Sequence, residues 1–262
     1  MGLSTELFKL YVFSVAFVFF SVCHAHEQSM VLIPSGSYVP FFITKKKDPK
    51  KSNDQPVSVK SFLIDKYPVT QKEFLAFLKK NPQWQKSEVK NIFVDSHYLE
   101  NWSGDTKPPA NQLQAPVVFV SWFAANAYCK SLNKKLPSVD QWEYVADDHG
   151  HGPKEAKDKI LDWYSKPNPT KLPSVGKEKP NGYGVYNLYG LVWEWTLDFN
   201  SAIIGDESRA SGTTDNSLFC GSGALGSIDP ADYARFMRYS FRSSLKANYT
   251  TGNLGFRCAK DL

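Results

Sequence analysis

Three segments of the chain combine a helix-capping residue with apolar residues at helical spacing. Thr70 is followed three residues later by Glu73, and Ser138 by Gln141, which is the pattern of a capping box. Ser121 is a third N-cap candidate in front of an apolar stretch. The apolar positions behind these caps are Phe74, Leu75 and Leu78, then Phe123, Ala127, Tyr128 and Leu132, and then Trp142 and Val145. The pattern predicts three short helices.

Short apolar stretches bounded by turn residues predict strands. Residues 30–38 are typical of a strand, a turn and a second strand, residues 57–64 of one further strand, and residues 117–120 of a short apolar strand. We expect turns and short strands at 183–195, 217–224 and 236–258, and loops at 44–56, 82–114 and 147–183. Three capped helices among long loops and broken strands indicate an α+β domain with little regular secondary structure.

The N-terminus is typical of a secretory signal peptide. Residues 10–20 are an apolar run behind Lys9, and small residues end in a plausible cleavage site after Ala25. The run is too short to span a bilayer comfortably. We therefore expect residues 1–25 to be removed and residues 26–262 to form one exported domain, periplasmic or secreted, with no membrane attachment.

The composition is that of a globular protein with an ample core. Apolar residues make up 42% of the chain and aromatic residues 15%, and the net charge is a mild +5. The densest basic run, residues 45–51, has no interleaved aromatic residues and no nucleic-acid-binding motif beside it. We interpret that run as a solvated loop and expect no nucleic-acid partner.

Cysteine usage fits an oxidising compartment. The chain has 4 cysteines, of which Cys23 would leave with the signal peptide. Cys129, Cys220 and Cys258 remain, and this odd number predicts one disulfide and one leftover thiol.

Several segments, taken together and in order, resemble the formylglycine-generating enzyme family, also called the sulfatase-modifying factor family. They are residues 30–36, 67–74, 116–129, 135–144, 181–195 and 253–258. The Trp-Glu-Trp sequence at 193–195 and the closing Asn-Leu-Gly-Phe-Arg-Cys at 253–258 carry most of the specificity. The resemblance covers nearly the whole mature chain, and it implies the family's compact fold, related to C-type lectins.

The resemblance implies a structural calcium site around the Trp-Glu-Trp turn. Its ligands would be the side chains of Asn187 and Glu194 and the carbonyls of Gly190 and Val192, all of them hard oxygen donors. Leu191 stands where the family commonly has an asparagine. The alternative is that Glu194 only hydrogen-bonds within a buried turn.

The resemblance also implies a disulfide between Cys129 and Cys258. The alternative is two reduced, buried cysteines. A second disulfide of the family would join the positions of Ala146 and Ser243, and both of its cysteines are missing together.

The family's oxidase chemistry depends on a cysteine pair that binds Cu(I), a soft ion that needs thiolates. In this chain the two positions fall on Tyr233 and Arg238, and there is no cysteine between 221 and 257. Formylglycine generation by the family's mechanism is therefore not expected, although other enzyme activity stays open.

Two interpretations of Cys220 stay open. It lies where the family's Gly-Gly-Ser segment leads into the active-site groove, so it is a candidate reactive thiol or soft-metal ligand. The alternative is that it is a small buried residue. In the same groove, Tyr233, Arg235, Arg238 and Arg242 are candidates for binding a peptide's carboxylates or backbone.

Three functions follow from these observations. The first is an accessory or maturation factor that binds a protein or peptide partner, with copper enzymes as a candidate class of partner. The second is a metal-dependent oxidoreductase that uses copper or iron at a different site, for example on a peptide or siderophore. The third is a secreted, lectin-like binding module. The fold alone does not choose among them.

Overall fold

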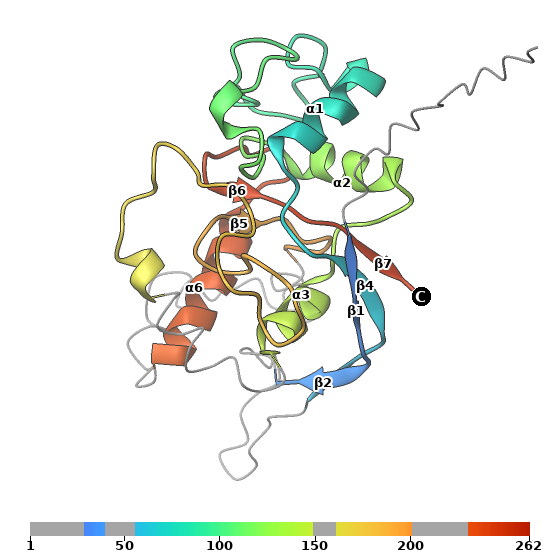
Figure 1. The fold of residues 1–262 in the computed structure, drawn as a ribbon, viewed down its shortest axis with the longest axis vertical. Coiled ribbons are helices and arrows are strands. Elements are labelled where there is room, and N and C mark those ends of the chain that lie inside the picture. Colours follow the sequence, from blue (N-terminus) through green and yellow to red (C-terminus); the bar gives the residue numbers. More distant parts are fainter. Residues whose placement is uncertain (1–28, 40–55, 149–160, 201–229) are drawn as a thin grey trace, which may run out of the picture.

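The computed structural model describes residues 29–39, 56–148, 161–200 and 230–262. Figure 1 shows short strands on one side of the molecule, helices around a loop-rich centre and the C-terminus beside the strands. The strands are β1 (Met30–Ile33), β2 (Gly36–Tyr38), β3 (Val57–Val59), β4 (Phe62–Asp65), β5 (Trp193–Glu194), β6 (Leu254–Gly255) and β7 (Ala259–Asp261). The α-helices are α1 (Gln71–Lys80), α2 (Trp122–Ser131), α3 (Val139–Ala146) and α6 (Pro230–Ser244), with short 3₁₀ turns at Pro82–Trp84 and Ala110–Gln112.

The described strands form three small sheets. The largest is antiparallel with the order β1-β4-β7, so the C-terminal strand closes onto the N-terminal hairpin region. The strands β2 and β3 form an antiparallel pair, and β5 and β6 form a parallel pair. The predicted single strand at 57–64 is wrong, because the chain breaks between β3 and β4 and the two halves pair with different partners.

The three predicted helices are present with the predicted caps. Thr70 and Glu73 form a complete capping box at α1, and Ser138 and Gln141 form another at α3. The Ser121 side chain accepts a hydrogen bond from the backbone N–H of Ala124 at α2. These local interactions satisfy N–H groups that a helix leaves unpaired at its start.

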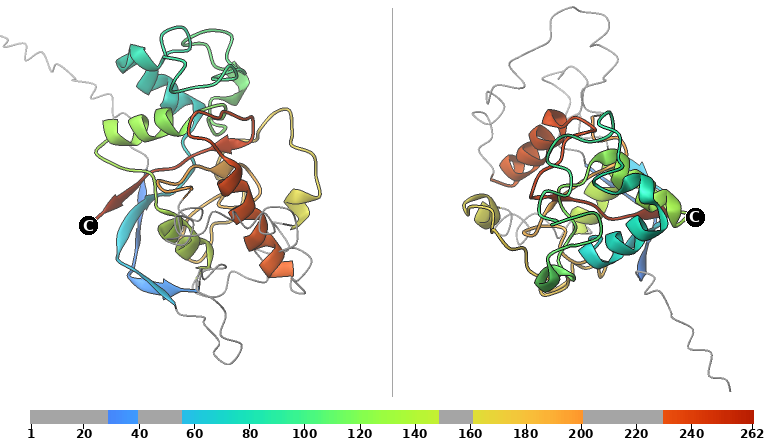
Figure 2. Two further views of the ribbon diagram at one scale, coloured as in Figure 1. Left: turned by 180° about the vertical axis from the view of Figure 1, so that it is seen from behind. Right: turned by 90° about the horizontal axis from the view of Figure 1, so that it is seen from above.

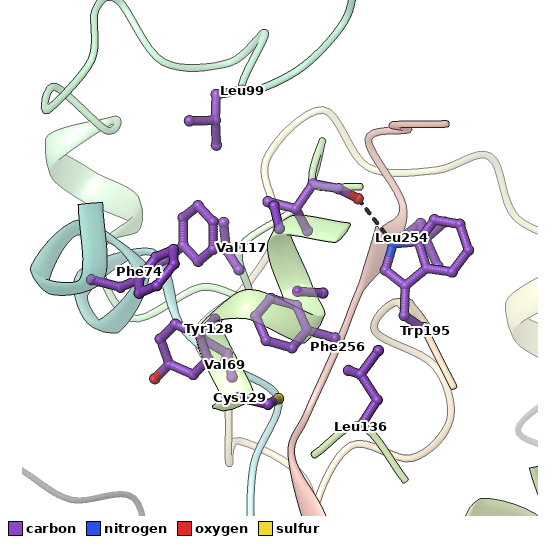
Figure 3. Close-up of a cluster of buried hydrophobic side chains, with 14 of the residues drawn as sticks. Val69, Phe74, Leu99, Val117, Tyr128, Cys129, Leu136, Trp195, Leu254 and Phe256 are labelled. Atoms are coloured by element: carbon purple, nitrogen blue, oxygen red, sulfur yellow. Dashed lines mark hydrogen bonds between the residues drawn. The ribbon is translucent and has the colours of Figure 1, made fainter. Parts of the chain in front are cut away.

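The largest core cluster lies between α1, α2 and the C-terminal segment (Figure 3). The rings of Phe74 and Tyr128 stack with centroids 6.0 Å apart, and Phe256 meets Tyr128 edge-on at 5.3 Å. The indole N–H of Trp195, the second tryptophan of the Trp-Glu-Trp sequence, donates to the Val120 carbonyl at 2.9 Å. The core cluster therefore holds the Trp-Glu-Trp turn in place through the side chain of Trp195.

Cys129 on α2 and Cys258 beside β7 are joined by a disulfide, with their Cα atoms 5.6 Å apart. Both residues are fully buried in the large core cluster. The bridge closes a loop between positions separated by 129 residues, and the chain-entropy model gives such a crosslink about 4–5 kcal/mol.

The strand predicted at 117–120 is not formed. Phe119 has a φ of 57°, which is incompatible with an extended strand. The segment instead bonds to two separate parts of the chain, because Val117 N–H donates to Val69 and Phe119 N–H donates to Thr251, each at 2.9 Å. It is a buried connector rather than a member of a sheet.

The helix α6 is the main departure from the predicted secondary structure. Turns and short strands were expected at 236–258, but Pro230–Ser244 is a helix of 15 residues. Its sequence carries helix signals, since Pro230 stands at its first position and Arg242 in its last turn. In the left view of Figure 2, α6 crosses the body diagonally. The strand expected at 217–224 lies outside the described residues. No helix in the described part of the chain is long and apolar enough to cross a membrane.

Candidate functional site

The Trp-Glu-Trp turn is built around a buried ion pair. Glu194 accepts hydrogen bonds from the Arg257 guanidinium at both carboxylate oxygens, 2.7 Å at Oε1 and 2.8 Å at Oε2. The indole N–H of Trp142 donates to Oε2 at 2.8 Å. Both charged side chains are fully buried. The pair therefore joins α3, β5 and the C-terminal segment at one point.

Among the expected calcium ligands, some oxygen atoms accept hydrogen bonds from the protein and others do not. Asn187, at a φ of 55°, accepts a hydrogen bond from the Gly176 N–H at 2.7 Å. The carbonyls of Gly190 and Val192 have no hydrogen-bond donor among the described residues. A carboxylate offers about four acceptor positions, so Glu194 keeps capacity at Oε1 beside Arg257. The oxygen donors are compatible with calcium, and the calcium site stays a prediction.

A second ion cluster ties α3 to α6. Arg238 donates to both oxygens of Glu143, from Nε to Oε1 at 3.1 Å and from Nη2 to Oε2 at 2.7 Å. Arg242 donates from Nη1 to the same Oε1 at 2.5 Å. Both guanidinium groups are buried, Arg238 with 6% and Arg242 with 8% of its surface exposed. One carboxylate thus neutralises part of a double positive charge inside the protein.

The electrostatics of this cluster favour its charged form. Burial alone would raise the pKa of Glu143, but attraction and hydrogen bonds from Arg238 and Arg242 outweigh it and lower the pKa from 4.5 to about 2. Burial would lower the pKa of Arg238, and the Glu143 carboxylate reverses this and raises it above its ordinary value. The cluster is therefore fully ionised near neutral pH.

Aromatic faces cover the two guanidinium groups. The Arg242 guanidinium lies 4.9 Å from the ring centroid of Trp142, and that of Arg238 lies 5.8 Å from the same ring and 5.5 Å from Tyr189. Such cation–π contacts hold the arginine planes in place. The cluster is consequently a fixed, desolvated feature rather than a set of mobile surface charges.

Four aromatic rings, which we call the ring stack, pack against one another beside the ion cluster. Trp193 lies between Tyr164 and Phe241, with centroid distances of 5.4 and 4.3 Å and interplanar angles of 14° and 21°. Trp163 packs against Trp193 at 5.1 Å. All four rings are partly exposed. They come from three segments: a helical turn at 161–164, β5 and α6.

A small pocket lies between the ion cluster and the ring stack. Its lining consists of Trp142, Trp163, Tyr164, Leu188, Tyr189, Val192, Trp193, Glu194, Arg238, Phe241 and Arg242. The cavity is about 10 Å³, room for a group about the size of one water molecule. The Tyr164 hydroxyl is buried and has no hydrogen-bond partner among the described residues. The pocket thus has aromatic walls and a polar interior.

The structure brings together two of the four expected groove residues. Arg238 and Arg242 meet at Glu143, which sequence reasoning missed. A shared partner for Arg238 and Arg242 could have been predicted only if this segment had been recognised as a helix. Residues four apart on a helix lie on the same face and can contact one neighbour. Tyr233 and Arg235 belong to α6, but their side chains, and all of Cys220, lie outside the described residues.

At one of the two expected copper positions the structure shows a residue that does not fit copper. Arg238 stands at one of the two positions, and its guanidinium is a buried cation bound to a carboxylate. An arginine has no lone pair to offer a metal, and a soft ion such as Cu(I) needs sulfur. Among the described residues, no group of three His, Cys, Asp or Glu side chains could hold a metal ion.

Comparisons with known proteins agree on one family. Residues 17–262 match the family model described as the sulfatase-modifying factor enzyme 1-like domain. The "Inactive C-alpha-formylglycine-generating enzyme 2" of Mus musculus is 26% identical over 285 residues, covering 90% of this chain and 87% of that protein. The "Formylglycine-generating enzyme" of Mus musculus is 26% identical over 292 residues, covering 88% and 75%.

Solved structures agree on the fold. The structure titled "Structure of PvdO from Pseudomonas aeruginosa" matches with a TM-score of 0.52 at 20% identity, covering 89% of this chain and 94% of the other. The "Crystal Structure of CarF" matches with a TM-score of 0.51 at 16% identity, covering 89% and 98%. These likenesses confirm the expected α+β fold with little regular structure. On the match of its sequence from residue 17 to residue 262, this chain belongs to the sulfatase-modifying factor family.

Proposed function

We propose that the chain is an exported accessory or maturation factor, which binds a protein or peptide partner and does not oxidise a cysteine. The observation that carries this proposal is the ion pair of Arg238 with Glu143. It places a buried positive charge where the family resemblance positions one of the two copper-binding thiolates. A copper–dithiolate centre needs two sulfur ligands, and this position supplies none.

The comparisons also support a family member without oxidase activity. The relatives at 26% and 29% identity include proteins named inactive formylglycine-generating enzymes, from Mus musculus and Bos taurus. The family therefore contains members whose names describe no oxidase activity, and their similarity extends over most of this chain. Because function depends on the site and not on the fold, a family member without the oxidase site is free to serve another role, and we propose recognition.

The ring stack of Trp163, Tyr164, Trp193 and Phe241 is the proposed contact surface. Partly exposed tryptophan and tyrosine rings offer large contact areas at a low cost in side-chain entropy, and they are enriched where proteins bind each other. The stack lies directly beside the pocket. The partner class that we propose is an exported protein, with copper enzymes as the first candidates to examine.

Site-specific photo-crosslinking tests this function. A benzoylphenylalanine residue in place of Trp163 lies in the ring stack, and the same residue in place of Ile92, which is 74% exposed, serves as the control. Irradiation in the native host should give a discrete adduct with one partner from position 163 and none from position 92. Equal labelling at both positions, or no adduct at position 163, would contradict the proposal.

A further inference from the structure

The disulfide between Cys129 and Cys258 is flanked by a buried ion pair. Lys134 donates from Nζ to Oδ1 of Asp65 at 2.9 Å, and only 3% and 1% of the two side chains are exposed. Each partner also contacts the backbone of one cysteine, Lys134 that of Cys129 and Asp65 that of Cys258. The ion pair therefore connects the same two segments of the chain as the disulfide.

The end of α2 places Lys134 beside Cys129. Asn133 has a φ of 54°, the left-handed conformation that commonly follows the last turn of a helix. The Asn133 N–H donates to the Lys130 carbonyl at 3.1 Å, and the Lys134 N–H donates to the Cys129 carbonyl at 2.9 Å. These two hydrogen bonds are those of a Schellman motif. The local turn thus holds Lys134 next to Cys129 through bonds that do not involve the sulfur atom.

Asp65, at the end of β4, holds the second cysteine. Its N–H donates to the Cys258 carbonyl at 2.8 Å, and its Oδ2 accepts a hydrogen bond from the Cys258 N–H at 2.9 Å. One residue thus binds both backbone groups of Cys258 and, through Oδ1, the ammonium group of Lys134. Hydrogen bonds to charged groups are stronger than neutral ones, and a buried site strengthens them further.

We propose that Lys134 and Asp65 are positioning residues, which bring the thiols of Cys129 and Cys258 together before the disulfide forms. A first link between two segments raises the effective concentration of the groups that make the second link. Cys220, which is not among the described residues, is a third cysteine behind the predicted signal peptide, so more than one pairing is open during oxidative folding. The ion pair favours Cys258 as the partner of Cys129. This role does not depend on the partner protein proposed above.

Oxidation by glutathione disulfide measures this positioning. One thiolate of the pair attacks glutathione disulfide to give a mixed disulfide, and the second thiolate then displaces glutathione from it. In total, Cys129 and Cys258 lose two electrons and two thiol protons, and glutathione disulfide becomes two glutathione thiols. The equilibrium constant of this exchange in the folded chain, which we call the glutathione constant, is the effective concentration of one cysteine thiol at the other.

The test compares two pairs of substitutions in the full chain. Asp65→Asn with Lys134→Met removes both buried charges together, which avoids leaving one of them unpaired. Lys135→Met with Asp261→Asn is the matched control, because this ion pair also joins the segment behind α2 to β7, but 30% and 63% of its side chains are exposed. We expect the glutathione constant to fall about tenfold in the first variant, which loses a buried, charge-assisted hydrogen bond. The control should change it by less than about threefold.

Peptide mapping gives a second readout. Each chain is reduced, unfolded and refolded in a glutathione buffer, its free thiols are blocked, and the linked peptides are quantified by mass spectrometry without reductant. The parent chain and the control should contain the link between Cys129 and Cys258, and Asp65→Asn with Lys134→Met should also contain links to Cys220. Circular dichroism of the reduced chains in sucrose, which favours the folded state, verifies that the glutathione constants compare folded proteins.

Two outcomes would overturn the positioning role: the same glutathione constant in the parent chain and in Asp65→Asn with Lys134→Met, or an equal fall in the control. If the reduced variant does not stay folded in sucrose, the pairing pattern decides, and an unchanged share of the link between Cys129 and Cys258 contradicts the role. Both readouts are independent of the crosslinking at position 163, so either proposal can fail while the other stands.

Discussion

Arg238 on α6 and Glu143 on α3 form a two-pronged ion pair, with hydrogen bonds of 3.1 and 2.7 Å. The family's second disulfide would join the same two helices, through the positions of Ala146 and Ser243. Neither position is a cysteine in this chain. The ion cluster therefore ties α6 to α3 without a covalent bond, and this tether is independent of thiol redox state.

The first prediction concerns the strength of this tether. Glu143→Gln removes the carboxylate charge that Arg238 and Arg242 both contact, and breaking a buried pair in this way costs roughly 3–5 kcal/mol. The free energy of unfolding in urea measures the loss. Glu100→Gln is the control, since the side chain of Glu100 is 54% exposed, and we expect its effect to be within about 0.5 kcal/mol. Similar small effects for both variants would show that the cluster does not hold α6.

The second prediction is the response of the tether to acid. The folded-state pKa of Glu143 is about 2, below its ordinary value of 4.5. Its contribution to stability is therefore fully present above pH 4.5, and it is lost as the pH falls toward 2. Urea unfolding across this range should show a steeper loss of stability for the parent chain than for Glu143→Gln. Parallel curves would contradict the assignment.

The third prediction concerns a buried ion pair near the disulfide. Asp65 accepts a hydrogen bond from Lys134 at 2.9 Å, and both side chains are buried. Burial raises the pKa of Asp65 from 3.8 to about 6, although Lys134 and the Cys258 N–H act to lower it. The stability linked to Asp65 is thus present below pH 3.8 and is lost as the pH rises through 6.

Lys134→Met removes the ammonium group that does most to hold this pKa down, so the Asp65 pKa rises further. We expect a loss of roughly 3–5 kcal/mol at pH 8 and a clearly smaller loss at pH 5, where the carboxyl takes up a proton. Lys130→Met, at an exposed position, is the control and should show little effect at either pH. A loss for Lys134→Met that is the same at both pH values would argue against a raised pKa.

The fourth prediction tests the calcium site. If calcium binds at Asn187, Gly190, Val192 and Glu194, then calcium at about 100 times its Kd should stabilise the fold by about 2.7 kcal/mol relative to a chelated sample. Asn187→Gly should abolish this gain, because it removes the side-chain oxygen and tolerates the positive φ. Asn133→Gly is the matched control, with a φ of 54° at a position outside the expected set of calcium ligands. Equal melting temperatures with calcium and with chelator would refute the site.

The sequence predicted those parts of the fold that depend on local interactions. The capping pairs Thr70–Glu73 and Ser138–Gln141 act within one helical turn, so their positions alone indicated α1 and α3. The break between β3 and β4 depends on which distant strands pair with each half. No local pattern within residues 57–64 contains that information, and the prediction failed there.

The candidate site was predictable only in part for the same reason. Arg238 and Arg242 were identified from the family's motif positions, but their burial against Glu143 depends on α6 packing beside α3. The partnerless hydroxyl of Tyr164 is visible only once residues 161–164, β5 and α6 are in place. A pocket of this kind is a property of three segments far apart in the chain.

Exposure of a sulfatase-type cysteine peptide to the purified chain, with Cu(I) and oxygen supplied, tests the central claim most directly. Aldehyde formation is followed by hydrazide capture and mass spectrometry, with an active formylglycine-generating enzyme as the positive control. We predict that the peptide keeps its thiol and that no hydrazide adduct forms. Conversion of the cysteine to the aldehyde in repeated turnovers would contradict the proposal that this chain does not oxidise a cysteine.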